Sequence, residues 1–426
     1  MIKDEEIKQM LDEHSWMMAK LSGGPEDNGN EFVEYAESIC LKRLKEIYGE
    51  LVPEEFIKRA KREIRAFAEI GQLENIFKLS DHLHKLINKG ELVVPRLSTG
   101  NSLVLFLFGI SNVNPMPKHH YCRKCHTFHW GKKENDICEY CGEPLVEDGF
   151  CLPFEMLIGD IQRMMHPFVF STSGKTEINN SLCKLYSVDE LKFAKKLGIT
   201  QKDLLEYPNN IEEVIRCFNQ KYYSEKYKRK DIVDHPAFIG LGDLGNRIIQ
   251  QCVLNYDVKT FEEFINVVTM MHGIGVNEAN SIYHMNIYSR DDLYASLRYN
   301  QLSNDDALLI CRETRLEGYG HLSSLSESKL KEAGVNNEFI DYLKSIHYIF
   351  HKAHVIASLK VSLKLADIYL KEPERFYRAY FSLHKKTLLK IGKVDDLIKK
   401  IVELKSTELE QFLFWIIDYK ERYKKQ

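Results

Sequence analysis

The chain has 426 residues, of which 44% are hydrophobic and 28% charged, with only 11 prolines. This is an ordinary globular composition with room for two or three domains, and it excludes a low-complexity chain. The net charge of −3 provides no general attraction to nucleic acid, so DNA binding would depend on local basic stretches. Ten cysteines, four in a metal-binding pattern and the rest scattered, indicate a reducing compartment and no disulfide framework.

The N-terminal stretch MIKDEEIKQMLDEH is acidic and has helical spacing, unlike a secretory signal. The most apolar run, SLVLFLFGI at 102–110, is too short to span a bilayer, and we expect it to form a buried strand or core helix. These features predict a cytoplasmic, soluble protein without membrane contact.

Helical spacing of apolar residues dominates the first ninety residues. It predicts a helix over 4–20, a loop at 22–30, and helices over 31–49 and 53–90, with Pro53 at the second helix start and Gly90 as its C-terminal cap. Short strands are expected at ELVVP and around Phe168–Phe170. From about residue 175 the pattern is almost entirely helical to the terminal ELEQFLFWIIDYKERYKKQ, with a domain boundary near the glycine-bearing turn GLGDLGNR.

Two CxxC pairs form the clearest motif in the chain. Twelve residues separate the first pair from the second, and the four cysteines are Cys122, Cys125, Cys138 and Cys141. Each short CxxC turn directs two sulfurs inward, and four thiolates suit a tetrahedral zinc ion. Gly131 between the pairs and Gly142 after the last cysteine provide the permissive backbone that such turns require.

A complete set of four cysteines leaves no open position for water or substrate, so we expect the zinc to be structural. Four histidines crowd the motif and are alternative ligands: His119, His120, His126 and His129.

The segment VVPRLSTGNSLVLFLFGISNVNPMPKHHYCRKC resembles the PolC-type (Gram-positive) DNA polymerase III alpha subunit. That family has an arginine-glycine-serine-x-glycine-serine-serine turn, an apolar run, VNPLP, and a tyrosine leading into a four-cysteine zinc module. The matching positions are Arg96, Ser98, Gly100, Ser102, Val113, Asn114, Pro115, Pro117, Tyr121 and the four cysteines. Further similarities, such as DGFCLPFEMLIG at 148–159, extend over most of the chain and imply a palm-derived first half and a fingers-like second half.

The departures from the family concern its catalytic acids. A polymerase of this kind needs three palm carboxylates to hold two magnesium ions, because hard cations require oxygen ligands. By ungapped alignment, two of these acids fall on Pro167 and Val169, and the third falls on Tyr186 of SLCKLYS. Only about a dozen residues separate Gly174 from Tyr186, where the family has a long block of palm strands and thumb. We therefore predict no templated polymerisation.

The resemblance also implies residues that contact phosphate. In the turn RLSTGNS, the guanidinium, hydroxyls and backbone amides of Arg96, Ser98, Gly100 and Ser102 are expected to hold a nucleotide phosphate. The alternative is that Arg96 is a surface residue or part of a structural ion pair.

Several further segments are candidate DNA contacts. The run KYYSEKYKRK mixes basic and aromatic residues. MMHGIG is typical of a helix–GxG–helix hairpin, in which amides at a helix N-terminus meet a DNA phosphate. Two other segments match family positions near nucleic acid. The candidates are Lys226, Lys228, Arg229, Lys230, Arg247, Gly273, Gly275, Lys352 and His354. A solvated linker, a tight turn between core helices, an exposed lysine and a hydrogen-bonded core histidine are the structural alternatives.

Together these features predict an α+β protein that is mostly α-helical, with a small reduced polymerase-palm sheet, a four-cysteine zinc module and a helical fingers-like domain. The expected divisions are a palm-derived region at 1–117, the zinc module at 118–150, a shortened palm remnant and basic linker at 151–230, the fingers-like domain at 231–390 and C-terminal helices at 391–426.

The function that this predicts is that of a catalytically inactive remnant of the polymerase, a pseudoenzyme that binds DNA or a replication protein. Its DNA target would be primer–template or single-stranded DNA. One alternative is an active polymerase or other nucleotidyltransferase with a rebuilt metal site, which would require two carboxylates near Arg96. Another is a zinc-stabilised protein-interaction module without a nucleic-acid role.

Overall fold

A computed structural model of the chain describes most of residues 28–404. The described ranges are 28–131, 137–164, 168–174, 183–206, 241–245, 258–273, 287–316, 322–346, 348–384 and 394–404, with isolated positions at 208, 211, 213–216, 249, 252–253 and 256. The expected helix at 4–20, the basic run at 221–230 and the helix after residue 407 lie outside these residues.

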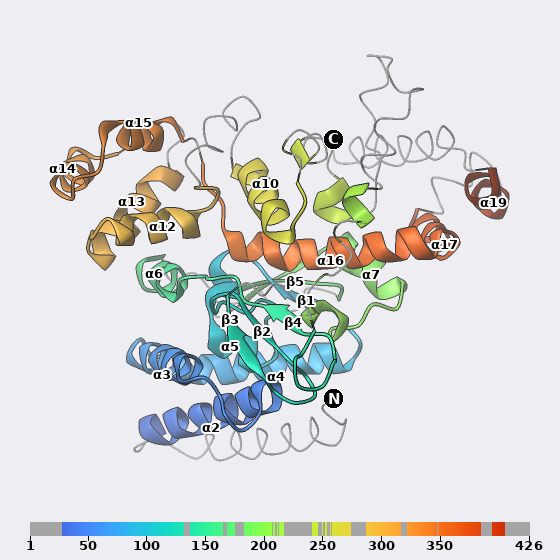
Figure 1. Cartoon of the computed structure of the whole chain (residues 1–426), viewed down its shortest axis with the longest axis horizontal. Coiled ribbons are helices and arrows are strands. Elements are labelled where there is room, and N and C mark those ends of the chain that lie inside the picture. The colour runs from blue at the N-terminus through green and yellow to red at the C-terminus, as the bar shows by residue number, and fades with distance from the viewer. Residues whose placement is uncertain are drawn as a thin grey trace.

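Three helices form the N-terminal layer, at the bottom of Figure 1. They are α2 (Asn28–Tyr48), α3 (Glu54–Glu69) and α4 (Leu73–Asn88). The prediction of one helix over 53–90 is wrong, because the chain turns at Gly71, which has a φ of 67°. There the amide of Gln72 donates to the carbonyl of Phe67 (2.8 Å) and ends α3.

The next elements build the turn that resembles the polymerase motif. Strand β1 (Val93–Pro95) leads into a 3-10 helix, η1 (Leu97–Asn101), and then into the short helix α5 (Leu103–Leu107). The strand prediction for ELVVP is confirmed. The apolar run after it is a core helix, because Ser102 accepts a hydrogen bond from the amide of Leu105 and caps its first turn.

Two small sheets follow. The first has the order β1-β5-β6, with β5 (Phe168–Thr172) antiparallel to β1 and parallel to β6 (Cys183–Ser187). The second has the order β3-β2-β4, from β2 (His119–Tyr121), β3 (Phe128–Trp130) and β4 (Val146–Asp148), and it carries the cysteine motif. The strand at Phe168–Phe170 is confirmed. Strand β6 is the one described exception to the almost entirely helical pattern expected from about residue 175.

The remaining elements are helical. They are α6 (Phe154–Met164), α7 (Asp189–Lys196), η2 (Asp203–Leu205), η5 (Gly242–Gly245), α10 (Phe261–Gly273), α12 (Arg290–Tyr299), α13 (Asn304–Leu316), α14 (Ser324–Glu332), α15 (Asn337–Ser345), α16 (Lys352–Lys371), α17 (Pro373–Leu383) and α19 (Val394–Leu404). In Figure 1, α16 crosses the molecule between the sheets below and α10 above. The described chain is thus mostly helical, with two small sheets.

Three apolar cores hold these layers together. One joins α2–α5 to one face of the first sheet through Phe168, Phe170 and Leu185. A second surrounds α16, which buries residues on all sides along its length, as expected for a central helix. The third lies among α12–α15. Among the described residues, no helix is both long enough and apolar enough to cross a bilayer.

Candidate metal centre and nucleic-acid site

The four cysteines of the motif come together in one group. All of their sulfurs lie within 4.8 Å of one another, with Cys122 and Cys141 3.4 Å apart and Cys125 and Cys138 3.3 Å apart. Four thiolates around zinc, with Zn–S bonds of about 2.3 Å, place neighbouring sulfurs about 3.8 Å apart. The group can therefore hold a tetrahedral metal ion such as zinc.

Backbone hydrogen bonds form the two loops that carry the cysteines. The amide of Cys122 donates to the carbonyl of Thr127 (2.9 Å), and the amide of Cys138 donates to that of Glu143 (2.8 Å). Gly131 and Gly142 have φ values of 76° and 72°, as predicted for these turns. The two loops therefore have the same geometry, and each directs two sulfurs toward the shared metal position.

The nearby histidines have other partners. The His119 Nε2 lies 2.9 Å from the Tyr48 hydroxyl, and the His120 Nδ1 lies 2.8 Å from the carbonyl oxygen of Gly131. His119 also packs among aromatic rings, including Phe56 and Phe128. Among the described residues, the cysteines alone form a metal-binding group of three or more side chains. The module is thereby anchored to α2 and α3 by its aromatic face.

The first sheet brings together two of the positions that the ungapped alignment predicts to match the family's catalytic acids. Val169 is on β5 and Tyr186 is on the adjacent parallel strand β6, where Tyr186 is opposite Ser171. Val169 is buried, and Tyr186 is 47% exposed. Pro167 lies outside the described residues. The two described positions therefore carry an aliphatic and an aromatic side chain on neighbouring strands.

Arg96 bridges these strands. Its amide donates to the carbonyl of Val169 (2.8 Å), its Nη1 donates to the Ser171 hydroxyl (2.9 Å), and its Cζ lies 5.3 Å from the centre of the Tyr186 ring. Burial lowers the pKa of Arg96, while Tyr186 and Asp243 favour its charged form. The guanidinium is thus a half-buried cation held against the sheet.

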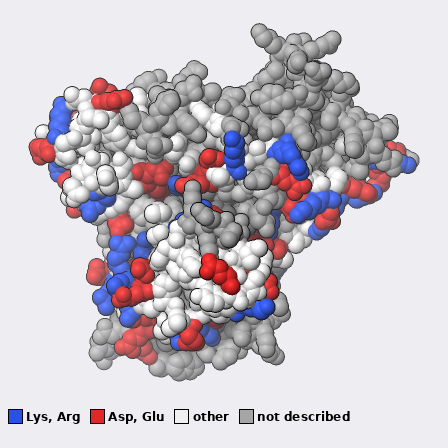
Figure 2. Space-filling view, in the orientation of Figure 1, with Lys and Arg blue, Asp and Glu red and all other residues white. Residues whose placement is uncertain are grey.

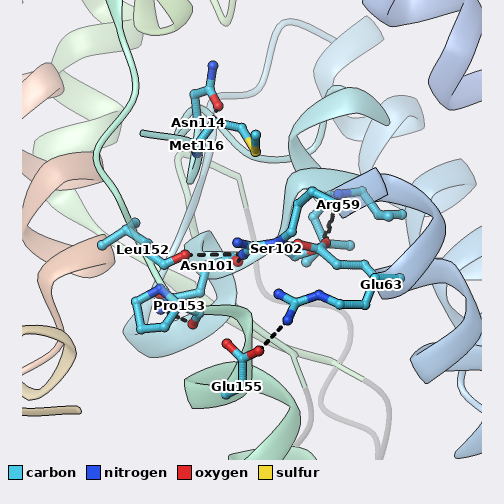
Figure 3. A network of polar contacts seen from close by, with 12 residues as sticks. Arg59, Glu63, Asn101, Ser102, Asn114, Met116, Leu152, Pro153 and Glu155 are labelled. Carbon is cyan, nitrogen blue, oxygen red and sulfur yellow. Dashed lines mark hydrogen bonds and ion pairs between the residues drawn. The ribbon is translucent and has the colours of Figure 1, made fainter. Parts of the chain in front are cut away.

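A buried network holds the rest of the turn (Figure 3). The Glu63 carboxylate of α3 accepts hydrogen bonds from the Ser102 hydroxyl (2.8 Å) and the Val104 amide (3.1 Å), and it pairs with Arg59 (2.5 Å). Arg59 also donates to the carbonyl of Asn101 (3.1 Å). Because Ser102 is fully buried, its hydroxyl supports the turn from inside the protein.

Two further positions of the turn are defined by backbone geometry. Leu97 has a φ of 54°, a left-handed conformation that favours glycine, and it occupies the position of the first glycine in the family motif. Gly100 is buried against α16, where an added Cβ would lie 2.9 Å from the Cβ of Ala353. Gly100 therefore permits the close approach of the turn to α16. Ser98 is also buried.

The two predicted contacts on α16 are engaged within the protein. Lys352 pairs with Asp292 (3.1 Å). Burial lowers the pKa of Lys352, but the carboxylates around it, led by Asp292, together raise it above its usual value. His354 accepts a hydrogen bond at Nδ1 from the amide of Leu97 (3.2 Å). Burial and the Arg96 charge lower the pKa of His354 to about 3, so its imidazole is neutral at neutral pH.

The structure adds an acidic pair near Arg96 that the sequence analysis did not identify. Asp243 lies 3.3 Å from His272 and accepts a hydrogen bond from Ser358. Burial raises the pKa of Asp243, but His272, the Ser358 hydrogen bond and His354 together lower it below its usual value. Burial and the Asp243 charge raise the pKa of Glu190 to about 8. Glu190 accepts a hydrogen bond from Ser362 (2.9 Å). These residues are far apart in sequence, so no local motif could have revealed the pair.

One of the other predicted DNA contacts lies within the described residues. Gly273 is the last residue of α10. The others lie outside the described residues: Lys226, Lys228, Arg229, Lys230, Arg247 and Gly275.

Comparison with known proteins identifies a polymerase family. The family model of the bacterial DNA polymerase III alpha NTPase domain matches residues 34–281. A PolC-type DNA polymerase III of Thermotoga petrophila is 24% identical, with 88% of this chain and 36% of the relative covered. The enzyme of the same name from Bacillus subtilis is 23% identical, over 82% of this chain and 33% of the relative.

The similarity covers most of this chain but only part of each relative. The chain spans about a third of the length of these curated relatives. The alignment with the Thermotoga petrophila protein extends over 503 residues, which exceeds the 426 residues of this chain. That relative therefore contains residues that have no counterpart here.

Proposed function

The chain belongs to the bacterial DNA polymerase III alpha NTPase domain family, and from this we propose that it binds DNA without polymerising it. Its DNA ligand is primer–template or single-stranded DNA, and its role is that of a regulator, decoy or mimic of the replicative polymerase. The observation that supports the proposal is that Val169 and Tyr186, two positions predicted to match the catalytic acids, carry no carboxylate and lie beside a hydrogen-bonded Arg96.

The chemistry of the replaced positions supports inactivity. Two-metal phosphoryl transfer requires carboxylates that bridge or separately hold magnesium ions a few ångströms apart. An aliphatic chain and a phenol ring do not provide such ligands, and a guanidinium beside them repels a divalent cation. Beyond the cysteine group, the described residues contain no cluster of three potential metal ligands.

The overall charge provides no general attraction to DNA. On the face seen in Figure 2, basic and acidic side chains are interspersed over the coloured residues, in agreement with the net charge of −3. A weak general field means that affinity must come from particular groups, and we assign the first of these to Arg96. A replication protein is the second proposed partner.

A nucleotidyltransferase with a rebuilt metal site is the second candidate, and Asp243 with Glu190 is the observation that favours it. Both acids interact electrostatically with each other, and Asp243 also interacts with Arg96. Against this candidate, the carboxylate oxygens of both acids already have partners. Asp243 contacts His272 and Ser358, and Glu190 contacts Ser362. Primer extension with magnesium or manganese tests it: extension that is lost in Asp243→Asn supports the rebuilt site, and its absence supports the binding role.

We propose the same modular organisation as the sequence predicts, with a palm-derived region, a zinc module at 118–150 and a fingers-like helical part. Zinc in this arrangement is structural, because four cysteines complete its coordination. A zinc-stabilised interaction protein without a nucleic-acid role is the remaining alternative.

The test is fluorescence anisotropy with a labelled primer–template at low and high salt. We expect binding that weakens steeply with salt, because phosphate contacts release counterions. Arg96→Gln should weaken it, whereas Arg312→Gln, the same change at an exposed position of α13, should not. A further gain with matched nucleotide and magnesium would indicate that the turn binds triphosphate, and no binding at low salt would refute the DNA role.

A further inference from the structure

Tyr186 lies on one face of the first sheet, and the register of the strands determines which other side chains share that face. In the parallel pair β5–β6, Val169 is opposite Lys184 and Ser171 is opposite Tyr186. Opposite residues share one face of a sheet, so these four side chains lie on the same side. Cys183 and Leu185 alternate with them and point into the apolar core. The face opposite this core therefore carries one hydroxyl, one amine, one phenol and one aliphatic side chain. Ser171 and Val169 are buried on it, whereas Lys184 is half-buried and Tyr186 is exposed.

The Tyr186 ring is both exposed and supported. It is 47% exposed, so part of the ring is free to contact a ligand. The Arg96 guanidinium lies 5.3 Å from the ring centre, and its hydrogen bond to Ser171 fixes its position. A cation held in this way orients the ring, so little conformational freedom is lost when the free part of the ring is covered.

Lys184 gives this surface a positive charge. It is two residues before Tyr186 on the same strand face, is half-buried, and forms no ion pair with a residue that the structure describes. Asp243 offsets part of the Arg96 charge, but its carboxylate is engaged by His272 and Ser358. Among the described residues, nothing therefore prevents Lys184 from contacting an anionic group beside the ring.

We propose that Tyr186 stacks on an unpaired base of single-stranded nucleic acid while Lys184 contacts a neighbouring phosphate, without a metal ion. This inference rests on the proposed function and specifies its ligand. An aromatic ring beside a cation suits base and phosphate together. An unpaired base can turn its face to the ring, whereas bases within a duplex are already covered by their neighbours.

The absence of a metal requirement follows from the same face. Its four described side chains include no carboxylate, so a magnesium ion has no ligand among them. Magnesium would also compete with Lys184 for the phosphate. Binding should therefore be unchanged or weaker when magnesium replaces a chelator, in contrast to a metal-dependent nucleotide site.

The experiment measures anisotropy of a labelled oligothymidylate with the full chain in a chelator-containing buffer. We expect Tyr186→Ala to bind about 10-fold more weakly, which corresponds to the loss of one base stack. Tyr186→Phe should bind as tightly as the wild type, because it retains the ring. Tyr299→Ala is the matched control, since Tyr299 is 84% exposed at the end of α12.

Further arms separate stacking from other effects. Lys184→Gln should weaken binding and reduce its salt dependence. Tyr186→Leu should bind as weakly as Tyr186→Ala, because leucine keeps apolar area but has no ring to stack on a base. Thermal melting establishes that each variant is folded. If Tyr186→Ala does not fold, the comparison of Tyr186→Phe with Tyr186→Leu decides the matter.

The outcomes also distinguish this inference from the proposed function. If the wild type binds no oligonucleotide or primer–template at low salt, the proposed function fails and this inference fails with it. If the wild type binds but Tyr186→Ala binds equally well, only the stacking inference fails. Equal loss for single strand and duplex, or a requirement for magnesium, would likewise overturn it.

Discussion

The amide of Leu97 donates a hydrogen bond to Nδ1 of His354 (3.2 Å), which joins residues that are 257 positions apart. It connects the turn after β1 to the first turn of α16, the two segments that the sequence associates with nucleotide and template. The bond requires an unprotonated Nδ1, because an imidazolium has only donors. The backbone of Leu97 and the protonation state of His354 are thus linked.

The backbone of Leu97 gives the first prediction. Because its φ is 54°, glycine at this position relieves a left-handed conformation that costs a residue with a Cβ about 1 kcal/mol. We expect Leu97→Gly to be more stable than Leu97→Ala by about that amount, as measured by urea denaturation. At Lys78 within α4 the same pair should have the opposite order, since glycine destabilises a helix interior. The same order at both sites would contradict the prediction.

The pKa of His354 gives a prediction for pH dependence. Its folded value of about 3 lies below its ordinary value of 6.5, so the unfolded chain binds more protons between these limits. Stability should therefore fall as the pH decreases below about 6.5, by at most about 1.4 kcal/mol per pH unit from this residue. His354→Asn retains an acceptor for Leu97 and removes the titration. Its free energy of unfolding should depend less on pH, and equal slopes would refute the assignment.

The buried Glu63 carboxylate gives a prediction for stability. Glu63→Gln leaves the Arg59 guanidinium without its counterion, and loss of one partner of a buried pair costs about 3 kcal/mol. Denaturant unfolding should detect this change. Glu74→Gln is the control, because Glu74 pairs with Lys78 at 48% exposure of each side chain, and such pairs contribute less than about 1 kcal/mol. An unchanged free energy of unfolding in Glu63→Gln would mean that the network does not stabilise the turn.

The cysteine group gives a prediction for metal content. Cys122→Ser combined with Cys141→Ser should abolish stoichiometric zinc by elemental analysis and lower the melting temperature, because structural zinc contributes directly to folding. Cys151→Ser should keep its zinc, as this exposed cysteine is outside the group. Unchanged zinc in the double variant would disprove the ligand assignment.

The sequence by itself determined the features that depend on short spacing. The CxxC pairs predicted the four-cysteine group, and Pro53, ELVVP and the bulk around Phe168 predicted the start of α3, β1 and β5. These features depend on a few neighbouring residues, whose conformations and ligand directions are local. The family motifs predicted the polymerase relationship in the same way.

Tertiary structure decided what depends on residues far apart in the chain. Gly71 divides the expected helix over 53–90 because α3 and α4 must both pack against the sheet. Glu63 and Ser102 meet across 39 residues, and Arg96 meets Tyr186 only because β6 pairs with β5. No sequence spacing predicts that Asp243 and Glu190 lie together. Long-range packing brings them together, and their burial and neighbours shift their pKa values.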